Sequence, residues 1–134
     1  MAHHVTSKES KLLFRALGAN GTFSLASGIA LVGRSDAISM IIGLANERWL
    51  VGLGVMLILF GASLLVHAYR KRVRRAEAIA ISAMDLAWVV GSIVLVTAMP
   101  ELFSSTGIVV VLSVAAVVAL FFELQAIALW RTRA

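Results

Sequence analysis

Two carboxyl side chains, Asp85 and Glu123, lie inside long apolar runs, where they are the residues best placed to do chemistry. A carboxyl group at the centre of a bilayer costs about 2.5 to 3.5 kcal/mol on insertion scales, so it usually faces other protein groups and pairs with them. Such a group can carry a proton, hold a cation or fasten helices through hydrogen bonds. The two carboxyls therefore predict an intramembrane polar cluster, with either a functional or a purely structural role.

Counting from the nearest basic residues places the two carboxyls at a similar depth. Asp85 follows Arg75 by ten positions, and Glu123 precedes Arg131 by eight. At a rise of 1.5 Å per residue, each carboxyl lies roughly 12 to 15 Å along its helix from the basic anchor. We therefore expect Asp85 and Glu123 to face the same interior.

Helical phase, taken as 100° per residue, assigns further polar residues to the faces of these helices. Gln125 falls almost opposite Glu123, so we expect it to reach for the membrane interface instead. The alternative to a functional site is a purely structural role. In that case the polar residues hold helices together by hydrogen bonds, Trp88 packs in the bundle and His67 lies at the membrane interface. The candidate ligand-binding or proton-binding residues are Asp85, Glu123, Asn20, His67, Trp88, Ser24, Ser27, Ser82 and Ser92.

Four apolar runs must position these residues. Of the 134 residues, 60% are hydrophobic and 14% are charged, and the mean hydropathy is +0.96, a balance that indicates a membrane protein. The runs cover about 12–32, 49–69, 78–99 and 108–130, and each is long enough to cross a bilayer as a helix. We predict an all-α fold, a four-helix transmembrane bundle forming a single domain over 1–134.

The basic residues set the expected orientation. All 12 Lys and Arg residues except Arg34 and Arg48 fall on one side of the predicted spans, Arg133 included. The positive-inside rule then places both termini and the basic connection in the cytoplasm. Basic residues beside a membrane attract anionic lipid, and so short a stretch argues against nucleic acid. The expected lipid-contacting residues are Arg70, Lys71, Arg72, Arg74 and Arg75.

The connections on the outer side are predicted to be short interfacial segments. Asp36 precedes a short apolar segment over 37–44 and is expected to cap a helix lying along the outer surface. In the second connection Pro100 and Glu101 suit a first helical turn, and Gly107 is expected to end it.

Small residues on the third span supply a packing surface. Ala83, Ala87 and Gly91 are spaced four apart, which lets helix backbones approach closely. This row lies nearly opposite Asp85, so the third span can pack on two sides. A compact single-chain bundle explains the row, and a homodimer is the alternative. A shift of 65 residues aligns Asn20 with Asp85, a faint internal repeat that gives the two residues equivalent places.

The size and span count are similar to those of the small multidrug resistance transporters, four-helix proteins that work as dimers around a membrane-embedded carboxylate. That family carries a glutamate in the first span, where this chain has Asn20, and the carboxyls of this chain lie in the third and fourth spans. The resemblance covers architecture alone and implies a bundle that works as a dimer; no family is assigned.

These features favour a small, multi-pass, non-enzymatic protein of a cell membrane, with the bacterial inner membrane as the expected location. It would act by helix packing with itself or a membrane-protein partner, and bind a small ligand at the polar cluster. The alternative is a proton-coupled or cation-handling transporter that uses Asp85 and Glu123. The chain lacks the common enzymatic motifs and has no cysteine, which excludes thiol catalysis. We expect no cofactor and no metal, because His67 alone could ligate haem within a span.

Overall fold

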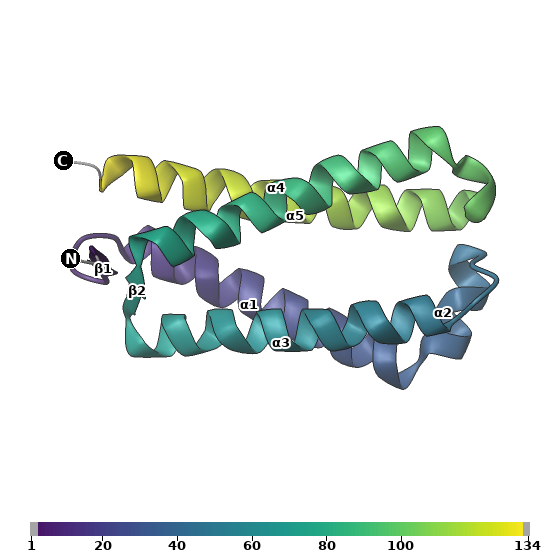
Figure 1. Ribbon diagram of the computed structural model, residues 1–134, viewed down its shortest axis with the longest axis horizontal. Helices are drawn as coiled ribbons and strands as arrows, with labels where there is room; N and C mark the ends of the chain where they lie inside the picture. The colour runs from purple at the N-terminus through teal and green to yellow at the C-terminus, as the bar shows by residue number, and fades with distance from the viewer. Residues whose placement is uncertain (1–2, 133–134) are drawn as a thin grey trace.

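The structure is a computed structural model that describes residues 3–132, so Arg133 lies outside the described residues. Four long helices run along the molecule, and β1 and the end of α5 lie at the same extremity (Figure 1). In chain order the elements are β1 (His4–Thr6), α1 (Lys11–Gly33), α2 (Ser35–Ile42), α3 (Arg48–Arg70), β2 (Arg72–Arg74), α4 (Arg75–Ala98), the 3-10 helix η1 (Pro100–Leu102) and α5 (Ser105–Arg131).

The four long helices match the four predicted spans. α1, α3, α4 and α5 are long and apolar enough to cross a membrane, and their ends lie within a few residues of the predicted ones. Serine side chains define two of the starts. The backbone N–H of Leu13 donates to Ser10 Oγ over 3.1 Å, and that of Gly107 donates to Ser104 Oγ over 2.9 Å. The coarse prediction of an all-helical bundle suited to a membrane is confirmed.

The helices form two antiparallel hairpins, α1 with α3 and α4 with α5 (Figure 1). Four glycines join the first hairpin. A Cβ added to Gly28 would lie 2.6 Å from the Gly54 carbonyl oxygen, and one added to Gly61 would lie 2.7 Å from the Gly21 carbonyl oxygen. Side chains larger than hydrogen do not fit at these crossings, so the α1 and α3 backbones are in direct contact.

A short antiparallel ribbon ties the chain start to the connection between α3 and α4. β1 pairs with β2 in the register His4 to Arg74, Val5 to Val73 and Thr6 to Arg72. The side chains of Val5 and Val73 are fully buried and join the apolar core at this end. Neither strand is apparent in the sequence, because three-residue strands among basic residues show no clear alternation.

The opposite end is closed by α2, which packs on the start of α5. The backbone N–H of Ser104 donates to the Ile42 carbonyl over 2.8 Å, and Ser104 Oγ donates to the Ile41 carbonyl over 2.8 Å. α2 confirms the expected short helix, but Asp36 lies in its first turn and Arg34 holds the capping position. Asp36 as the cap was therefore wrong.

The second outer connection also differs from expectation. Pro100 begins the 3-10 helix η1, and Glu101 lies in its first turn, as predicted for these two residues. That helix ends at Leu102, and Gly107 lies inside the first turn of α5 instead of ending the segment. A Cβ at Gly107 would collide with the Ile42 carbonyl, so this glycine serves the close approach of α2 to α5.

Candidate functional site

The candidate site is centred on Asp85, whose side chain is 4% exposed in the interior of the bundle. Its Oδ2 atom accepts a hydrogen bond from Asn20 Nδ2 over 2.8 Å and another from Gln125 Nε2 over 2.7 Å. The three residues come from α4, α1 and α5 respectively. One carboxyl oxygen therefore links both hairpins at a single point.

The two amide side chains are themselves held in place. Asn20 Oδ1 accepts a hydrogen bond from Ser24 Oγ over 3.2 Å, one turn along α1. Gln125 Nε2 also donates to the carbonyl of Phe121 over 2.9 Å, one turn back along α5. The Phe121 ring packs against Phe23 with ring centroids 5.8 Å apart, which adds an apolar contact between α1 and α5. The amide donors are thus directed at Asp85 by neighbours on their own helices.

Glu123 does not join this cluster. It is exposed on α5, whereas Gln125 is fully buried. The predicted roles of these two residues are therefore reversed, although they do lie on opposite sides of the helix as predicted. Helical phase fixes the angle between residues, but the rotation of the helix depends on the apolar positions that pack. In α5 these are Gly107, Ala115, Val118, Phe121, Ala128 and Leu129, and Gln125 shares their side.

The remaining polar residues of α4 and α1 lie at different levels of burial. Ser82 and Ser92 are buried, whereas Ser27 and Trp88 are half-buried. Within residues 3–132, Ser82 Oγ, Trp88 Nε1 and Gln125 Oε1 are buried atoms that make no hydrogen bond. All three belong to residues within one turn of Asp85 or bonded to it. The cluster therefore retains hydrogen-bonding capacity beyond the two bonds to Asp85.

His67 lies away from the cluster, at the basic end of α3. Its Nε2 atom is 3.9 Å from Oε2 of Glu77 in the first turn of α4. The same Glu77 accepts from the backbone N–H of Arg74 over 3.3 Å as part of a capping box. Within residues 3–132, no hydrogen bond joins His67 to Asp85, so the predicted proton relay between them is not seen. His67 instead lies beside the start of the second hairpin.

The row of small residues on α4 faces outward. Ala83, Ala87 and Gly91 are all exposed, and a Cβ added at Gly91 would meet nothing within 4 Å. Within residues 3–132 the row therefore lies on the outside of the bundle, and the compact single-chain explanation for it is wrong. Packing of this row against another chain stays a prediction.

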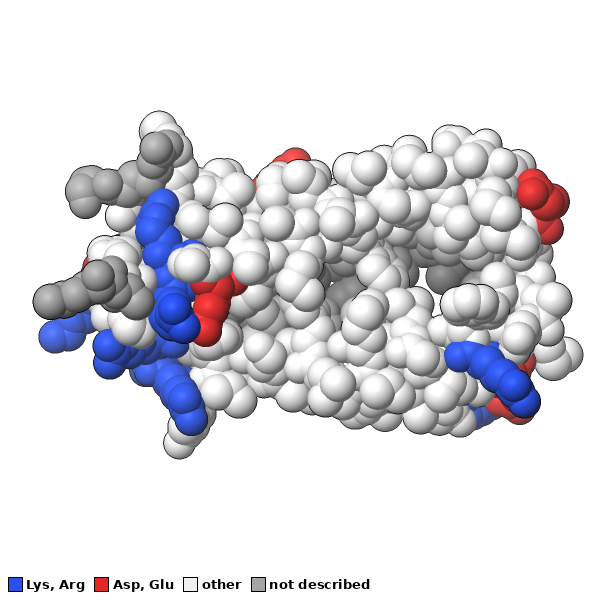
Figure 2. All heavy atoms as spheres, viewed as in Figure 1, with Lys and Arg blue, Asp and Glu red and all other residues white. Residues whose placement is uncertain are grey.

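The basic residues gather at one end of the molecule, where Figure 2 shows most of the Lys and Arg atoms. Arg70, Lys71, Arg72 and Arg74 are exposed there, as lipid contact requires. Arg75 has a different role. It donates from one guanidinium nitrogen to Thr132 Oγ1 and from the other to the Leu129 carbonyl, both over 2.9 Å, and so joins the start of α4 to the end of α5.

Chemically, the cluster is a carboxyl group held by neutral donors. Asn20 and Gln125 supply hydrogen bonds to Asp85 but no positive charge, so a proton or a cation is the species that would neutralise an ionised Asp85. In the part of the chain that the structure describes, no group of three or more His, Cys, Asp or Glu side chains could hold a metal ion.

Comparison with known proteins gives no further assignment. No protein-family model, no curated protein and no solved structure matches this chain. The four long apolar helices, compatible with a small membrane protein, are therefore the basis for its classification.

Proposed function

We propose that this chain is a non-enzymatic, multi-pass protein of a bacterial cell membrane that acts by packing against a second copy of itself. Both termini lie in the cytoplasm in this proposal, because the basic residues gather at that end. The observation that carries it is the outward face of α5, on which Glu123 is exposed at membrane depth.

The outward face of α5 has the spacing of a helix-packing seam. Seven exposed residues follow one another at alternating intervals of four and three, the heptad spacing of helices that pack side by side. Ser113 and Ala116 are small enough to allow close approach near the middle of the helix. The α5 seam consists of Val109, Ser113, Ala116, Leu120, Glu123, Ile127 and Trp130.

A second copy is the partner that this seam fits. Every copy inserts in the same orientation, so a two-fold axis along the membrane normal sets Glu123 beside its own equivalent at the same depth. Two carboxyl groups that share a proton can hydrogen-bond to each other and carry one negative charge in place of two, which offsets part of the cost of about 2.5 to 3.5 kcal/mol for a carboxyl left in lipid. The outward row Ala83, Ala87 and Gly91 on neighbouring α4 adds a second flat surface.

Cysteine cross-linking tests the dimer directly, because the chain has no cysteine of its own. Ile127→Cys on the seam is expected to form a covalent dimer when the protein is oxidised in its membrane. Leu59→Cys, at a residue 68% exposed on α3, is the matched control and should stay monomeric. Equal cross-linking at both positions would contradict the proposal.

A second substitution tests whether close approach at the seam matters. Ala116→Phe is expected to suppress the Ile127→Cys cross-link, since the larger ring separates the helices. Ala62→Phe, at an exposed alanine of α3, should leave the cross-link intact. Retention of the cross-link in both double variants would place the contact elsewhere.

Transport or small-ligand binding is the second candidate. It is favoured by three buried atoms without a hydrogen-bond partner among residues 3–132: Gln125 Oε1, on a residue bonded to Asp85, and Ser82 Oγ and Trp88 Nε1, each on a residue within one turn of Asp85 along α4. In this candidate Asp85 alone binds and releases the proton or cation, because Glu123 points away from it. Asp85→Asn should abolish proton flux into vesicles that contain a pH-sensitive dye, while the protein still assembles. Glu123→Gln is the control and should retain flux. Unchanged flux in Asp85→Asn rules out this role.

A further inference from the structure

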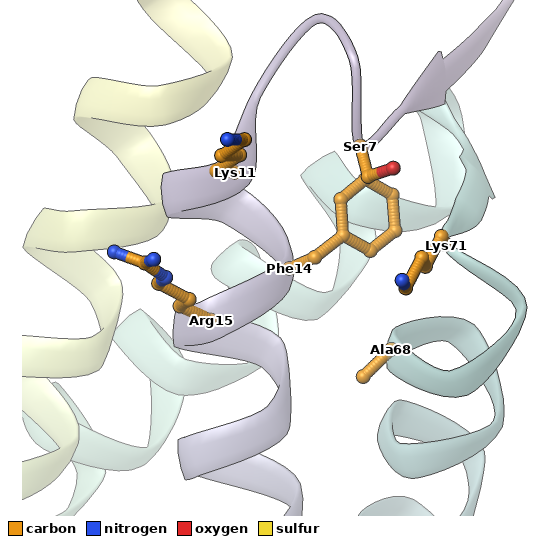
Figure 3. Close-up of a pocket in the computed structure, with 6 residues that line it drawn as sticks. All are labelled: Ser7, Lys11, Phe14, Arg15, Ala68 and Lys71. Atoms are coloured by element: carbon orange, nitrogen blue, oxygen red, sulfur yellow. The ribbon is translucent and has the colours of Figure 1, made fainter.

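A pocket opens at the basic end of the molecule, between the start of α1 and the end of α3. Its volume is about 380 Å³, and it is lined by Ser7, Lys11, Phe14, Arg15, Ala68 and Lys71. Figure 3 shows Lys11 and Arg15 on α1 and Lys71 on the α3 side, with the Phe14 ring directed toward Lys71 and the Arg15 side chain directed toward α5. Three cationic residues therefore belong to the lining of one recess, together with the apolar residues Phe14 and Ala68.

The charges of this pocket are not neutralised by neighbouring acids. Within residues 3–132, the acidic partners in ion pairs are Glu9, which pairs with His3, and Glu77, which pairs with His67 and Arg74. Lys11, Arg15 and Lys71 form no ion pair among these described residues, and all three are exposed. A pocket with three free cations and a serine hydroxyl has the chemistry to bind a phosphate group.

The backbone brings the two sides of the pocket together. The N–H of Ser7 donates to the Lys71 carbonyl over 3.2 Å, directly after the pairing of β1 with β2. Lys71 also has a φ of 54°, which makes it the one residue other than glycine with positive φ in the described chain. A left-handed residue is a common way for a helix to end, and Lys71 is the C-cap of α3. Here that conformation positions a cation at the pocket.

The position of the pocket identifies the source of the phosphate. It lies where α1 begins and α3 ends, at the level of the exposed aromatic residues Tyr69 and Trp130. Aromatic side chains at the ends of spans mark the headgroup layer of a bilayer. Phe14 and Ala68 on the pocket floor suit the apolar start of a lipid chain below a phosphate.

We propose that this pocket binds the phosphate of one anionic phospholipid in the cytoplasmic leaflet, with Lys11, Arg15 and Lys71 as its cationic contacts. This site differs from the diffuse attraction of the neighbouring basic residues, because its three cationic residues line one open recess together with Phe14 and Ala68. It rests on the proposed membrane insertion and does not depend on the α5 seam.

Lipid retention measured by native mass spectrometry tests the site. The purified protein is mixed with phosphatidylglycerol or with phosphatidylcholine, and the bound molecules are counted. We expect one retained phosphatidylglycerol and no comparable phosphatidylcholine. The variant Lys11→Gln, Arg15→Gln, Lys71→Asn should bind phosphatidylglycerol about tenfold or more weakly, since it removes the charged groups that contact the phosphate directly. Asparagine is chosen at 71 because it tolerates positive φ.

A matched control removes the same charge at the same end of the molecule. Lys8→Gln, Arg70→Gln, Arg131→Gln changes three exposed residues outside the pocket, and its phosphatidylglycerol binding should stay within about twofold of the parent. Equal weakening in both triple variants, or equal retention of the two lipids, overturns the proposal. If the pocket variant misfolds by circular dichroism, Lys71→Asn alone replaces it and must still show weaker binding.

Two further measurements distinguish a lipid phosphate from a free phosphate ion and test membrane insertion separately from lipid binding. Inorganic phosphate added as a competitor should displace little phosphatidylglycerol. If a low concentration of inorganic phosphate displaces the lipid and is itself retained, the pocket binds a free anion and the lipid proposal is overturned. Recovery of the protein in the membrane fraction of cells is measured in parallel. Recovery in the soluble fraction would refute membrane insertion itself, a failure distinct from weak lipid binding.

Discussion

The two hairpins use their small residues in opposite ways. In α1 and α3 the glycines Gly21, Gly28, Gly54 and Gly61 face one another and bring the two backbones into contact. In α4 the row Ala83, Ala87 and Gly91 is exposed, and a Cβ added at Gly91 would meet no atom of residues 3–132 within 4 Å. The small residues of the first hairpin are thus buried between its own two helices. The small residues of α4 in the second hairpin are exposed to the surroundings of the molecule. The same residue spacing therefore serves different purposes on neighbouring helices.

This contrast separates residues that stabilise the chain from residues available for a partner. Substitutions inside the first hairpin are expected to act on stability. Substitutions on the outward faces of α4 and α5 are expected to act on association and leave the monomer intact. Gly28→Leu tests that division, and Asp85→Leu and Arg75→Gln test the polar contacts made by α4; they are taken from the largest expected effect to the smallest.

The largest effect is expected from Gly28→Leu. A Cβ at this position already lies 2.6 Å from the Gly54 carbonyl oxygen and 2.8 Å from the Ile58 backbone nitrogen, so the helices must separate. We expect a loss of about 3 kcal/mol or more in the free energy of unfolding, measured by SDS titration in mixed micelles. Gly91→Leu, at a position open to its surroundings, is the matched control and should change stability by less than about 0.5 kcal/mol. Similar losses of unfolding free energy in Gly28→Leu and Gly91→Leu would contradict the difference proposed between the two hairpins.

A smaller effect is expected from Asp85→Leu, which removes the acceptor shared by the two hairpins. The amide groups of Asn20 and Gln125 lose their common partner in the interior, and the expected cost is about 2 kcal/mol. Asp85→Asn keeps an acceptor oxygen and should cost about half as much. The same micelle titration measures both. An Asp85→Leu variant more stable than the parent would show that Asp85 is kept for a reason other than stability.

The smallest of the three effects is expected from Arg75→Gln. Arg75 joins the start of α4 to the end of α5 through its bonds to Thr132 and Leu129, and the expected loss is about 1 kcal/mol. Arg74→Gln, at an exposed neighbour, serves as the comparison. Faster amide hydrogen exchange at the end of α5 in Arg75→Gln alone would localise the effect to the second hairpin; equal exchange in both variants would argue against it.

The sequence predicts the four helices well and the polar cluster only in part. Long apolar runs determine the helices with little dependence on tertiary contacts, so their limits are close to those observed. Asp85 and Asn20 are correctly predicted as interior residues, and the faint repeat that aligns them involves two residues that bond directly. The burial of Gln125 is not predicted, because both sides of α5 are apolar. The rotation of α5 about its own axis is instead set by its packing against α1 and α4.

The glycine contacts and the ribbon show two other reasons for failure. Gly21 with Gly28 and Gly54 with Gly61 are each seven apart on two helices, and a search for small residues four apart overlooks them. The ribbon depends on pairing between residues almost 70 positions apart, which local periodicity does not reveal. A search for heptad-spaced glycines on successive spans would have found the first feature.

The pairing of β1 with β2 also sets an order of assembly. β2 follows α3 in the chain, so β1 has no partner until the whole first hairpin has been synthesised. Burial of Val5 against Val73 therefore cannot precede completion of that hairpin. The ribbon is therefore a late contact of the first hairpin, one that cannot form before β2, which directly precedes α4, has been made.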